Sequence, residues 1–151
     1  MSDATDFFDA VVRYEIDLWN AVDTALQETH GLALGRFQAL RVLYERGGDG
    51  RVQDVAGDLH ITIGAASKLV DRLEHDGTAR RQPNPNDRRS SLIALTAEGR
   101  RVHDAASTTF EAALHASLPA RHGDGGLARL TAKLQQLRSH LEIAAGAGVT
   151  A

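Results

Sequence analysis

The chain has 151 residues, a length that predicts one domain with a buried core. Its formal net charge is −3 at pH 7, and it contains no cysteine, which excludes disulfides, thiolate metal sites and thiol redox sensing. No apolar run approaches the roughly 20 residues that span a membrane, and residues 1–9 do not resemble a signal peptide. We therefore expect a cytoplasmic protein with no membrane partner.

The charges are unevenly distributed along the chain. Residues 36–101 contain 12 Lys and Arg against 9 Asp and Glu, whereas the rest of the chain contains 5 against 11. Residues 78–101 alone carry six arginines and two acids. A local basic patch is a better footprint of phosphate binding than total charge, so a nucleic-acid contact is expected in the middle of the chain.

The first half of the chain is predicted to be helical. Apolar residues near i, i+3, i+4 and i+7 spacing predict a first helix of about six turns that ends near His30-Gly31. A second helix ends at Gly47-Gly48, and a short third helix covers residues 52–59. A fourth begins after Thr62, whose hydroxyl can accept from free N–H groups, and ends at Gly77, which can adopt the left-handed conformation.

A hairpin and two more helices complete the predicted order. Residues 79–82 and 90–95 flank a proline-containing loop and predict two paired strands. Thr96 is expected to cap a fifth helix. Residues 119–126 are expected to separate this helix from the last one, and residues 144–151 are expected to form a frayed tail. The last helix carries leucines spaced 3, 4, 3, 4, which is typical of a helix packed along another. These leucines are Leu127, Leu130, Leu134, Leu137 and Leu141.

Residues 52–71 have the spacing of a helix-turn-helix. His60 occupies the turn position where glycine is usual, and histidine tolerates a left-handed backbone better than most residues. Small residues would let the second helix enter the major groove, where Ser, Thr and Lys can reach base edges and phosphates. An ordinary helical hairpin with a solvated face is the alternative. The candidate DNA-binding residues of this helix are Thr62, Gly64, Ala65, Ser67, Lys68 and Arg72.

The predicted hairpin follows this helix directly and has a proline-stiffened tip that carries Asp87, Arg88 and Arg89. A guanidinium at such a tip can enter the narrow minor groove, where the negative potential is strongest. Asp87 is expected either to orient Arg89 through an ion pair or to cap the turn. A charged, solvated loop is the alternative, but the position of the arginines after the helix-turn-helix favours a DNA-binding wing.

Residues 69–100, LVDRLEHDGTARRQPNPNDRRSSLIALTAEGR, resemble the MarR family of bacterial transcription regulators. The most specific parts are the Asp-Arg-Arg-Ser wing leading into Leu-Thr-x-x-Gly-Arg and the preceding Leu-Val-Asp-Arg-Leu-Glu-x-x-Gly run. The resemblance covers essentially the whole chain. It implies a homodimer that binds palindromic operators in double-stranded DNA, usually as a repressor, and that often releases them on binding a small, commonly aromatic or phenolic, ligand. The groove helix then matches residues 62–72, and the minor-groove arginine matches Arg89, with Arg88 beside it.

The expected fold class is therefore mainly α with a small β-hairpin: a winged helix-turn-helix with N- and C-terminal dimerisation helices. Residues 1–33 are assigned to the N-terminal dimerisation helix and 34–100 to the winged helix-turn-helix DNA-binding region. Residues 101–145 are assigned to the C-terminal dimerisation helices and 146–151 to a tail, within a single compact domain.

The resemblance also implies a ligand pocket between the first two helices and the winged region. Aromatic side chains would line it, and basic side chains would meet a carboxylate or phenolate. Core or dimer packing is the alternative. The family's urate sensors pair an N-terminal Trp with an Asp at a position where this chain has Gln38, and its oxidant sensors use a cysteine that is absent here. The candidate ligand-binding residues are Arg13, Tyr14, Trp19, His30, Arg36 and Phe37.

Metal binding and catalysis have little support in the sequence. Asp104, Glu111 and His115 share one face of the fifth helix, and His30 could add a ligand, but one helix face rarely closes a tetrahedral zinc site. There is no Gly-rich phosphate loop or nucleophile elbow, so no enzyme and no cofactor are expected. Two alternatives stay open: a winged-helix protein-binding adaptor that does not read DNA, and a metal-responsive regulator.

Overall fold

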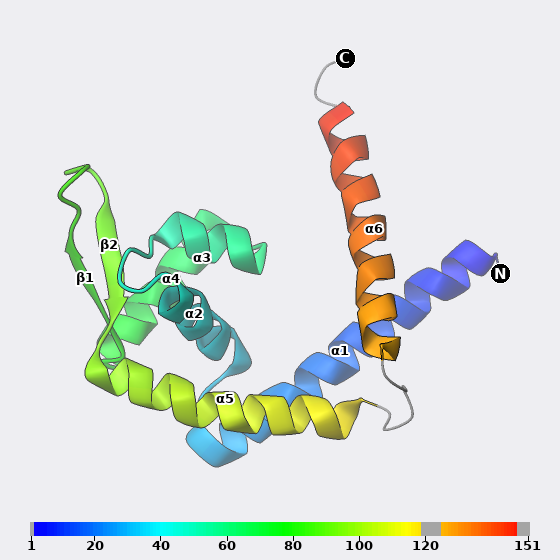
Figure 1. Ribbon diagram of the computed structural model, residues 1–151, viewed down its shortest axis with the longest axis horizontal. Helices are drawn as coiled ribbons and strands as arrows, with labels where there is room; N and C mark the ends of the chain where they lie inside the picture. Colours follow the sequence, from blue (N-terminus) through cyan, green and yellow to red (C-terminus); the bar gives the residue numbers. More distant parts are fainter. Residues whose placement is uncertain (1, 119–124, 148–151) are drawn as a thin grey trace. The chain divides into compact units, whose positions relative to one another are not determined.

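The computed structural model describes residues 2–118 and 125–147. It is mainly helical, with one two-stranded antiparallel sheet, and the helices and strands follow one another in the predicted order (Figure 1). The predicted fold class is therefore confirmed. The chain divides into two compact units, Met1–Ser117 and Leu118–Ala151. The finer boundaries at residues 33/34, 100/101 and 145/146 stay predictions.

Helix α1 (Asp3–His30) ends where the sequence predicts but is longer than six turns, because it has 28 residues. Ser2 caps its start, with the Thr5 N–H donating to the serine hydroxyl at 3.4 Å, and two acids in the first turn favour the helix dipole. Gly31 ends the helix in the left-handed conformation at φ 61° and donates its N–H to Gln27. Capping therefore extends the helix beyond its periodic apolar stretch.

Three helices form the helix-turn-helix region: α2 (Leu34–Glu45), α3 (Val52–Leu59) and α4 (Ile63–His75). His60 adopts the left-handed conformation at φ 52°, which confirms the expectation for the turn. The hydroxyl of Thr62 accepts from the Ala65 N–H at 3.1 Å and caps α4 as predicted. The inward side chains of α3 and α4, such as Val55 and Ala66, are fully buried.

The hairpin pairs β1 (Ala79–Pro83) with β2 (Ser91–Leu95), from Ala79 opposite Leu95 to Pro83 opposite Ser91. Gly50 adds an isolated bridge to Ile93, whose N–H donates to the Gly50 carbonyl at 2.7 Å. A Cβ at Gly50 would lie 2.7 Å from Leu43 Cδ2 and 3.1 Å from the Ile93 carbonyl oxygen, so a larger residue there would displace the Leu43 side chain. The segment that precedes α3 is thereby joined to the hairpin.

One hydrophobic core joins α1, α2, α3, α4, the hairpin and α5 (Ala97–Ser117). Phe37 on α2 is fully buried, and its ring centroid lies 5.1 Å from that of Phe110 on α5. Burial of side chains of this size contributes about 1.5–3 kcal/mol each. The largest fully buried side chains are Phe37, Leu26, Leu40, Leu43, Leu73, Ile93, Val22, Val55 and Val70.

The start of α5 is locked to the base of the hairpin. The Thr96 hydroxyl donates to the Gly77 carbonyl at 2.6 Å and accepts from the Gly99 N–H at 3.0 Å, so Thr96 caps the helix as predicted. Gly99 crosses the Thr78 backbone so closely that a Cβ would lie 1.8 Å from the Thr78 carbonyl oxygen. Glycine is therefore required there by close backbone approach.

Helix α6 (Gly126–Ala147) forms the described part of the second unit. It begins at the residue where the break was predicted to end and continues into the stretch predicted to fray, while residues 119–124 and 148–151 lie outside the described residues. Each leucine of the predicted seam is exposed, from 42% at Leu127 to 68% at Leu141. Across the described residues, no helix is both long and apolar enough to span a membrane.

The Gly99→Ala substitution should lower the free energy of unfolding by about 1–3 kcal/mol or prevent folding, because the added methyl group meets the Thr78 backbone. Gly57→Ala is the matched control, since it lies in a helix and its Cβ would meet no atom within 4 Å. The control should be neutral or stabilising by up to about 1 kcal/mol. Urea unfolding measures both, and equal effects of the two substitutions would contradict the close-approach explanation.

Candidate nucleic-acid interface

Helix α4 presents one face to the core and the opposite face to solvent. Ala66, Val70 and Leu73 are its buried residues. The predicted DNA-binding residues lie away from this buried stripe, and their side chains are small, polar or cationic. They comprise the exposed Thr62, Gly64, Ala65, Lys68 and Arg72 and the half-buried Ser67. Neither Lys68 nor Arg72 forms an ion pair with any of the described residues.

The hairpin tip is held in one conformation by Asn84, which is only 3% exposed. Its side-chain amide donates to the Ser90 hydroxyl at 2.9 Å, and its carbonyl oxygen accepts from the Asn86 N–H at 3.0 Å. Asp87 accepts from the Arg89 N–H at 2.9 Å. Of the two roles expected for Asp87, the structure therefore shows the turn cap.

Arg88 and Arg89 are exposed at this ordered tip. Within residues 2–118 and 125–147 their guanidinium groups form no ion pair. Each group keeps all its N–H donors for a phosphate or a groove edge. The predicted wing arginines are therefore chemically available.

Arg81 on β1 links the hairpin to α4. Its guanidinium contacts Asp71 Oδ1 at 2.7 Å and also pairs with Glu74, whose other oxygen accepts from the Arg81 backbone N–H at 2.9 Å. Burial lowers the pKa of Arg81, but the hydrogen bond with Asp71 and the charges of Glu74 and Asp71 outweigh it, so the pKa lies above its ordinary value. Arg81 therefore fixes the angle between the hairpin and α4 and is already neutralised.

Other arginines of the basic segment are neutralised in the same way. Arg46 pairs with Asp58 at 2.8 Å, Arg36 pairs with Asp76 at 2.8 Å, and Arg101 pairs with Glu98 at 2.5 Å. A count of basic residues over 36–101 therefore overstates the charge available to DNA. The cations without an ion pair among the described residues of this segment include Lys68 and Arg72 on α4 and Arg88 and Arg89 at the hairpin tip.

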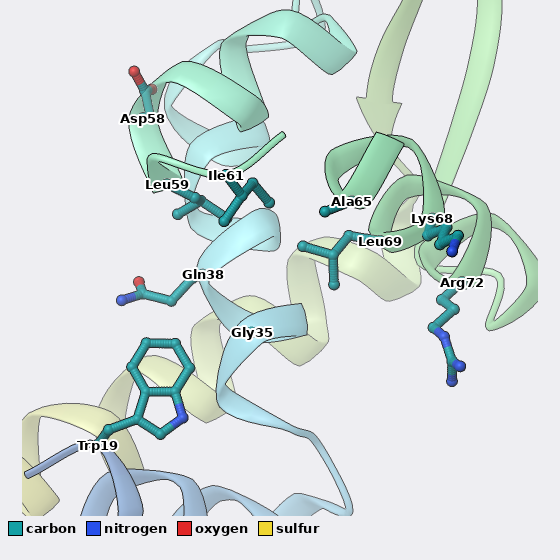
Figure 2. A pocket seen from close by; sticks show the side chains of 10 residues that line it. All are labelled: Trp19, Gly35, Gln38, Asp58, Leu59, Ile61, Ala65, Lys68, Leu69 and Arg72. Carbon is teal, nitrogen blue, oxygen red and sulfur yellow. The ribbon is translucent and has the colours of Figure 1, made fainter. Parts of the chain in front are cut away.

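A pocket of about 550 Å³ adjoins α4 on the side away from the hairpin (Figure 2). Figure 2 shows Trp19 of α1 on one side of the labelled group and Lys68 and Arg72 of α4 on the other. The lining is mostly apolar, so a ligand would bury an apolar body there. The lining residues are Trp19, Gly35, Gln38, Asp58, Leu59, Ile61, Ala65, Lys68, Leu69 and Arg72.

Only Trp19 of the six predicted ligand-binding residues lines this pocket. Phe37 is in the core, His30 Nε2 is hydrogen-bonded to Thr109 Oγ1 at 2.8 Å, and Arg36 pairs with Asp76. Arg13 and Tyr14 are exposed on α1. The six side chains are therefore not gathered into one site in this structure.

Sequence reasoning missed most of the pocket residues, including Gly35, Ile61 and Leu69. A helical period marks apolar positions but does not distinguish those that face a cavity from those that face packed core. In the sequence, Gln38 stands out only as a departure from the urate-sensing pattern. Its side-chain oxygen accepts from Arg41 at 2.8 Å.

No three His, Asp or Glu side chains of the described residues are grouped so that they could hold a metal ion. Asp104, one of the three residues of the metal hypothesis, contacts His103 Nδ1 at 3.0 Å. The ring of His103 stacks on Tyr44 with centroids 3.9 Å apart. Through these contacts, this part of α5 packs against Tyr44 of α2.

A helix-turn-helix followed by an antiparallel hairpin that continues from its second helix defines a winged helix-turn-helix protein. Residues 32–91 match the model of the MarR family. The HTH-type transcriptional regulator YkoM of Bacillus subtilis is 32% identical over 75 residues, which are 50% of this chain and 48% of YkoM. The chain thus spans about half the length of this curated relative.

Two solved structures extend the similarity. CouR of Rhodococcus jostii RHA1, bound to p-coumaroyl-CoA, is 29% identical with a TM-score of 0.79, covering 91% of this chain and 94% of CouR. Sco3205 of Streptomyces coelicolor, a MarR family regulator in complex with DNA, shares the fold at 22% identity and a TM-score of 0.84, covering 93% of this chain and 89% of Sco3205. Residues 32–91 therefore carry a MarR-family domain, and the chain shares the fold of MarR-family structures.

Replacing Asn84 by Ala should loosen the hairpin tip, because the Asn86 N–H and the Ser90 hydroxyl lose their partner. One net hydrogen bond corresponds to about 2- to 13-fold faster exchange of the residue 86 amide hydrogen, measured by NMR. Asn86→Ala is the control, since that side chain is exposed. Unchanged protection in Asn84→Ala would show that Asn84 does not order the tip.

Proposed function

We propose that this protein is a homodimeric DNA-binding transcription regulator that acts as a repressor and is released by a small ligand. The observation that carries the proposal is the pairing of two elements. Helix α4 exposes small and cationic side chains, and the ordered hairpin tip exposes Arg88 and Arg89. Arg81 holds the two elements at a fixed angle.

The two elements fit two different grooves of B-DNA. The major groove admits an α-helix, and the small side chains of Gly64 and Ala65 allow a close approach. The minor groove is narrower and concentrates negative potential, which favours the guanidinium groups of Arg88 and Arg89. Sco3205, which has the same fold, is in complex with DNA and supports this assignment.

A dimer is supported by apolar surface on the two terminal helices. Phe7 and Phe8 on α1 are 53% and 64% exposed, and the leucines of α6 are similarly exposed. A second copy of the chain is the simplest cover for these surfaces, because large exposed apolar patches usually mark interfaces. Two copies would present two α4 helices to half-sites about 34–36 Å apart, which is one turn of DNA.

Arg89→Ala should weaken binding to duplexes that the wild-type protein selects from a random pool, by about 1–3 kcal/mol, because one groove contact is lost. Losing one phosphate-neutralising cation would also reduce the slope of log affinity against log salt by about one. Fluorescence anisotropy of a labelled duplex over a salt series measures both quantities.

Arg129→Ala removes the same charge from α6, outside the unit that carries α4 and the hairpin, and serves as the control. It should leave the affinity close to the wild-type value. Failure of the wild-type protein to enrich any duplex would overturn the proposed function. An unchanged affinity in Arg89→Ala would remove the hairpin tip from the interface.

The ligand part of the proposal rests on the pocket beside α4. An apolar lining with Lys68 and Arg72 at one edge fits an apolar ligand that carries an anionic group. CouR is bound to p-coumaroyl-CoA, which has this chemistry. A ligand there would favour a dimer whose two hairpins no longer match the operator spacing.

Filling the pocket should weaken ligand binding but leave DNA binding unchanged. Gly35 lines the pocket and its Cβ would meet no atom within 4 Å, so Gly35→Leu places a side chain in the cavity. Calorimetric titration with p-coumarate and with p-coumaroyl-CoA should show at least tenfold weaker binding than wild type. Gly57→Leu on α3 is the control, because Gly57 is helical and does not line the pocket.

Equal binding by Gly35→Leu and Gly57→Leu would place the ligand elsewhere. The absence of any binding by the wild-type protein would exclude these two probes as ligands while leaving DNA binding intact.

A further inference from the structure

Ile63 is a large apolar residue that lies outside the hydrophobic core. It is the first residue of α4 and is 58% exposed. Thr62 performs the capping, so the start of the helix does not require Ile63. A β-branched residue is also a mediocre helix former. Neither burial nor helix formation explains an isoleucine here.

The surroundings of Ile63 belong to the candidate DNA interface. It lines a depression of about 260 Å³ between the start of α3 and the hairpin. Two arginines without an ion pair among the described residues, Arg51 and Arg89, share that depression with the ion-paired Arg81. An exposed isoleucine among arginines, at the end of α4 that leads into the groove, lies where a base edge would approach.

The major groove offers one apolar group to such a side chain, the C5-methyl group of thymine. Among the exposed residues at the start of α4, Thr62 and Ala65 each offer a single methyl group and Gly64 offers none, so Ile63 presents the largest apolar surface. We infer that Ile63 is a specificity-determining residue that packs on a thymine methyl group, so the preferred duplex has a thymine at one fixed position in each half-site. This inference rests on the proposed DNA-binding function.

The thymine methyl group can be removed without altering base pairing by substituting deoxyuridine. Each thymine of a selected duplex is replaced in turn, in both half-sites, and the affinity is measured by fluorescence anisotropy at one salt concentration. Losing the burial of one methyl group corresponds to about a fourfold weakening, so two half-sites give about fifteenfold. The wild-type protein should show this loss at one thymine position only.

Ile63→Ala should bind the unmodified duplex more weakly by a similar factor and should be insensitive to deoxyuridine at that same position. Ile63→Val keeps the branched β-carbon and should retain part of the sensitivity. Tyr44→Ala on α2 removes a large side chain that is 46% exposed and that belongs to neither proposed interface, and it serves as the control. Its deoxyuridine profile should match that of the wild type.

The two failures are distinguishable. If no duplex is enriched, the proposed DNA-binding function fails. If a duplex is enriched but has no fixed thymine, or if Ile63→Ala keeps the wild-type deoxyuridine profile, the assignment of Ile63 is overturned while DNA binding stands.

Discussion

The ion pairs of Arg81 with Asp71 and Glu74 determine how the hairpin is held against α4. Arg81 comes from β1 and both acids come from α4, so the contact crosses between the two elements that would meet DNA. Because the Arg81 side chain is about 29% exposed, the surrounding protein partly shields these pairs from solvent. The backbone N–H of Arg81 adds a hydrogen bond to Glu74, which fixes the main chain as well as the side chain.

Two glycines complete this framework. Gly50 allows the segment before α3 to bridge to Ile93 on β2, and Gly99 allows α5 to cross the backbone of Thr78 at the base of β1. The hairpin is therefore attached on three sides, to α4, to the segment before α3 and to α5. An element attached in this way moves with the helix-turn-helix, so a change in the spacing of two hairpins would require the whole winged region to move.

Local chemistry made most of the fold predictable from the sequence. Thr62 and Thr96 cap helices as hydroxyl residues do, Gly31 ends α1, and His60 accepts the left-handed turn. The site was harder to predict, because the charge of a residue and the helical period of its neighbours do not show which side chains it will contact. In the sequence Arg81 is one more basic residue, but in the structure Asp71 and Glu74 neutralise its charge. Phe37 and Trp19 lie on similar apolar stripes, but one is core and the other lines the pocket.

The pocket and the proposed DNA interface share α4, because Lys68 and Arg72 line the pocket and belong to the exposed groove-helix residues. A ligand in the pocket would therefore act on the same helix that reads DNA, without a long path between two sites. Leu73 anchors the C-terminal part of α4 in the core, and the Arg81 ion pairs join that part of the helix to the hairpin. A displacement of α4 at the pocket would therefore also move the hairpin.

The most direct test asks whether α4 and the hairpin tip contact one duplex together. The chain has no cysteine, so Asn86→Cys and Gly64→Cys each create one attachment point for an iron chelate that cleaves nearby DNA. The account predicts minor-groove cleavage from residue 86 and major-groove cleavage from residue 64 within the same half-site, with the pattern repeated about one helical turn away. Cleavage from only one of the two positions, or cleavage spread evenly along the duplex, would contradict it.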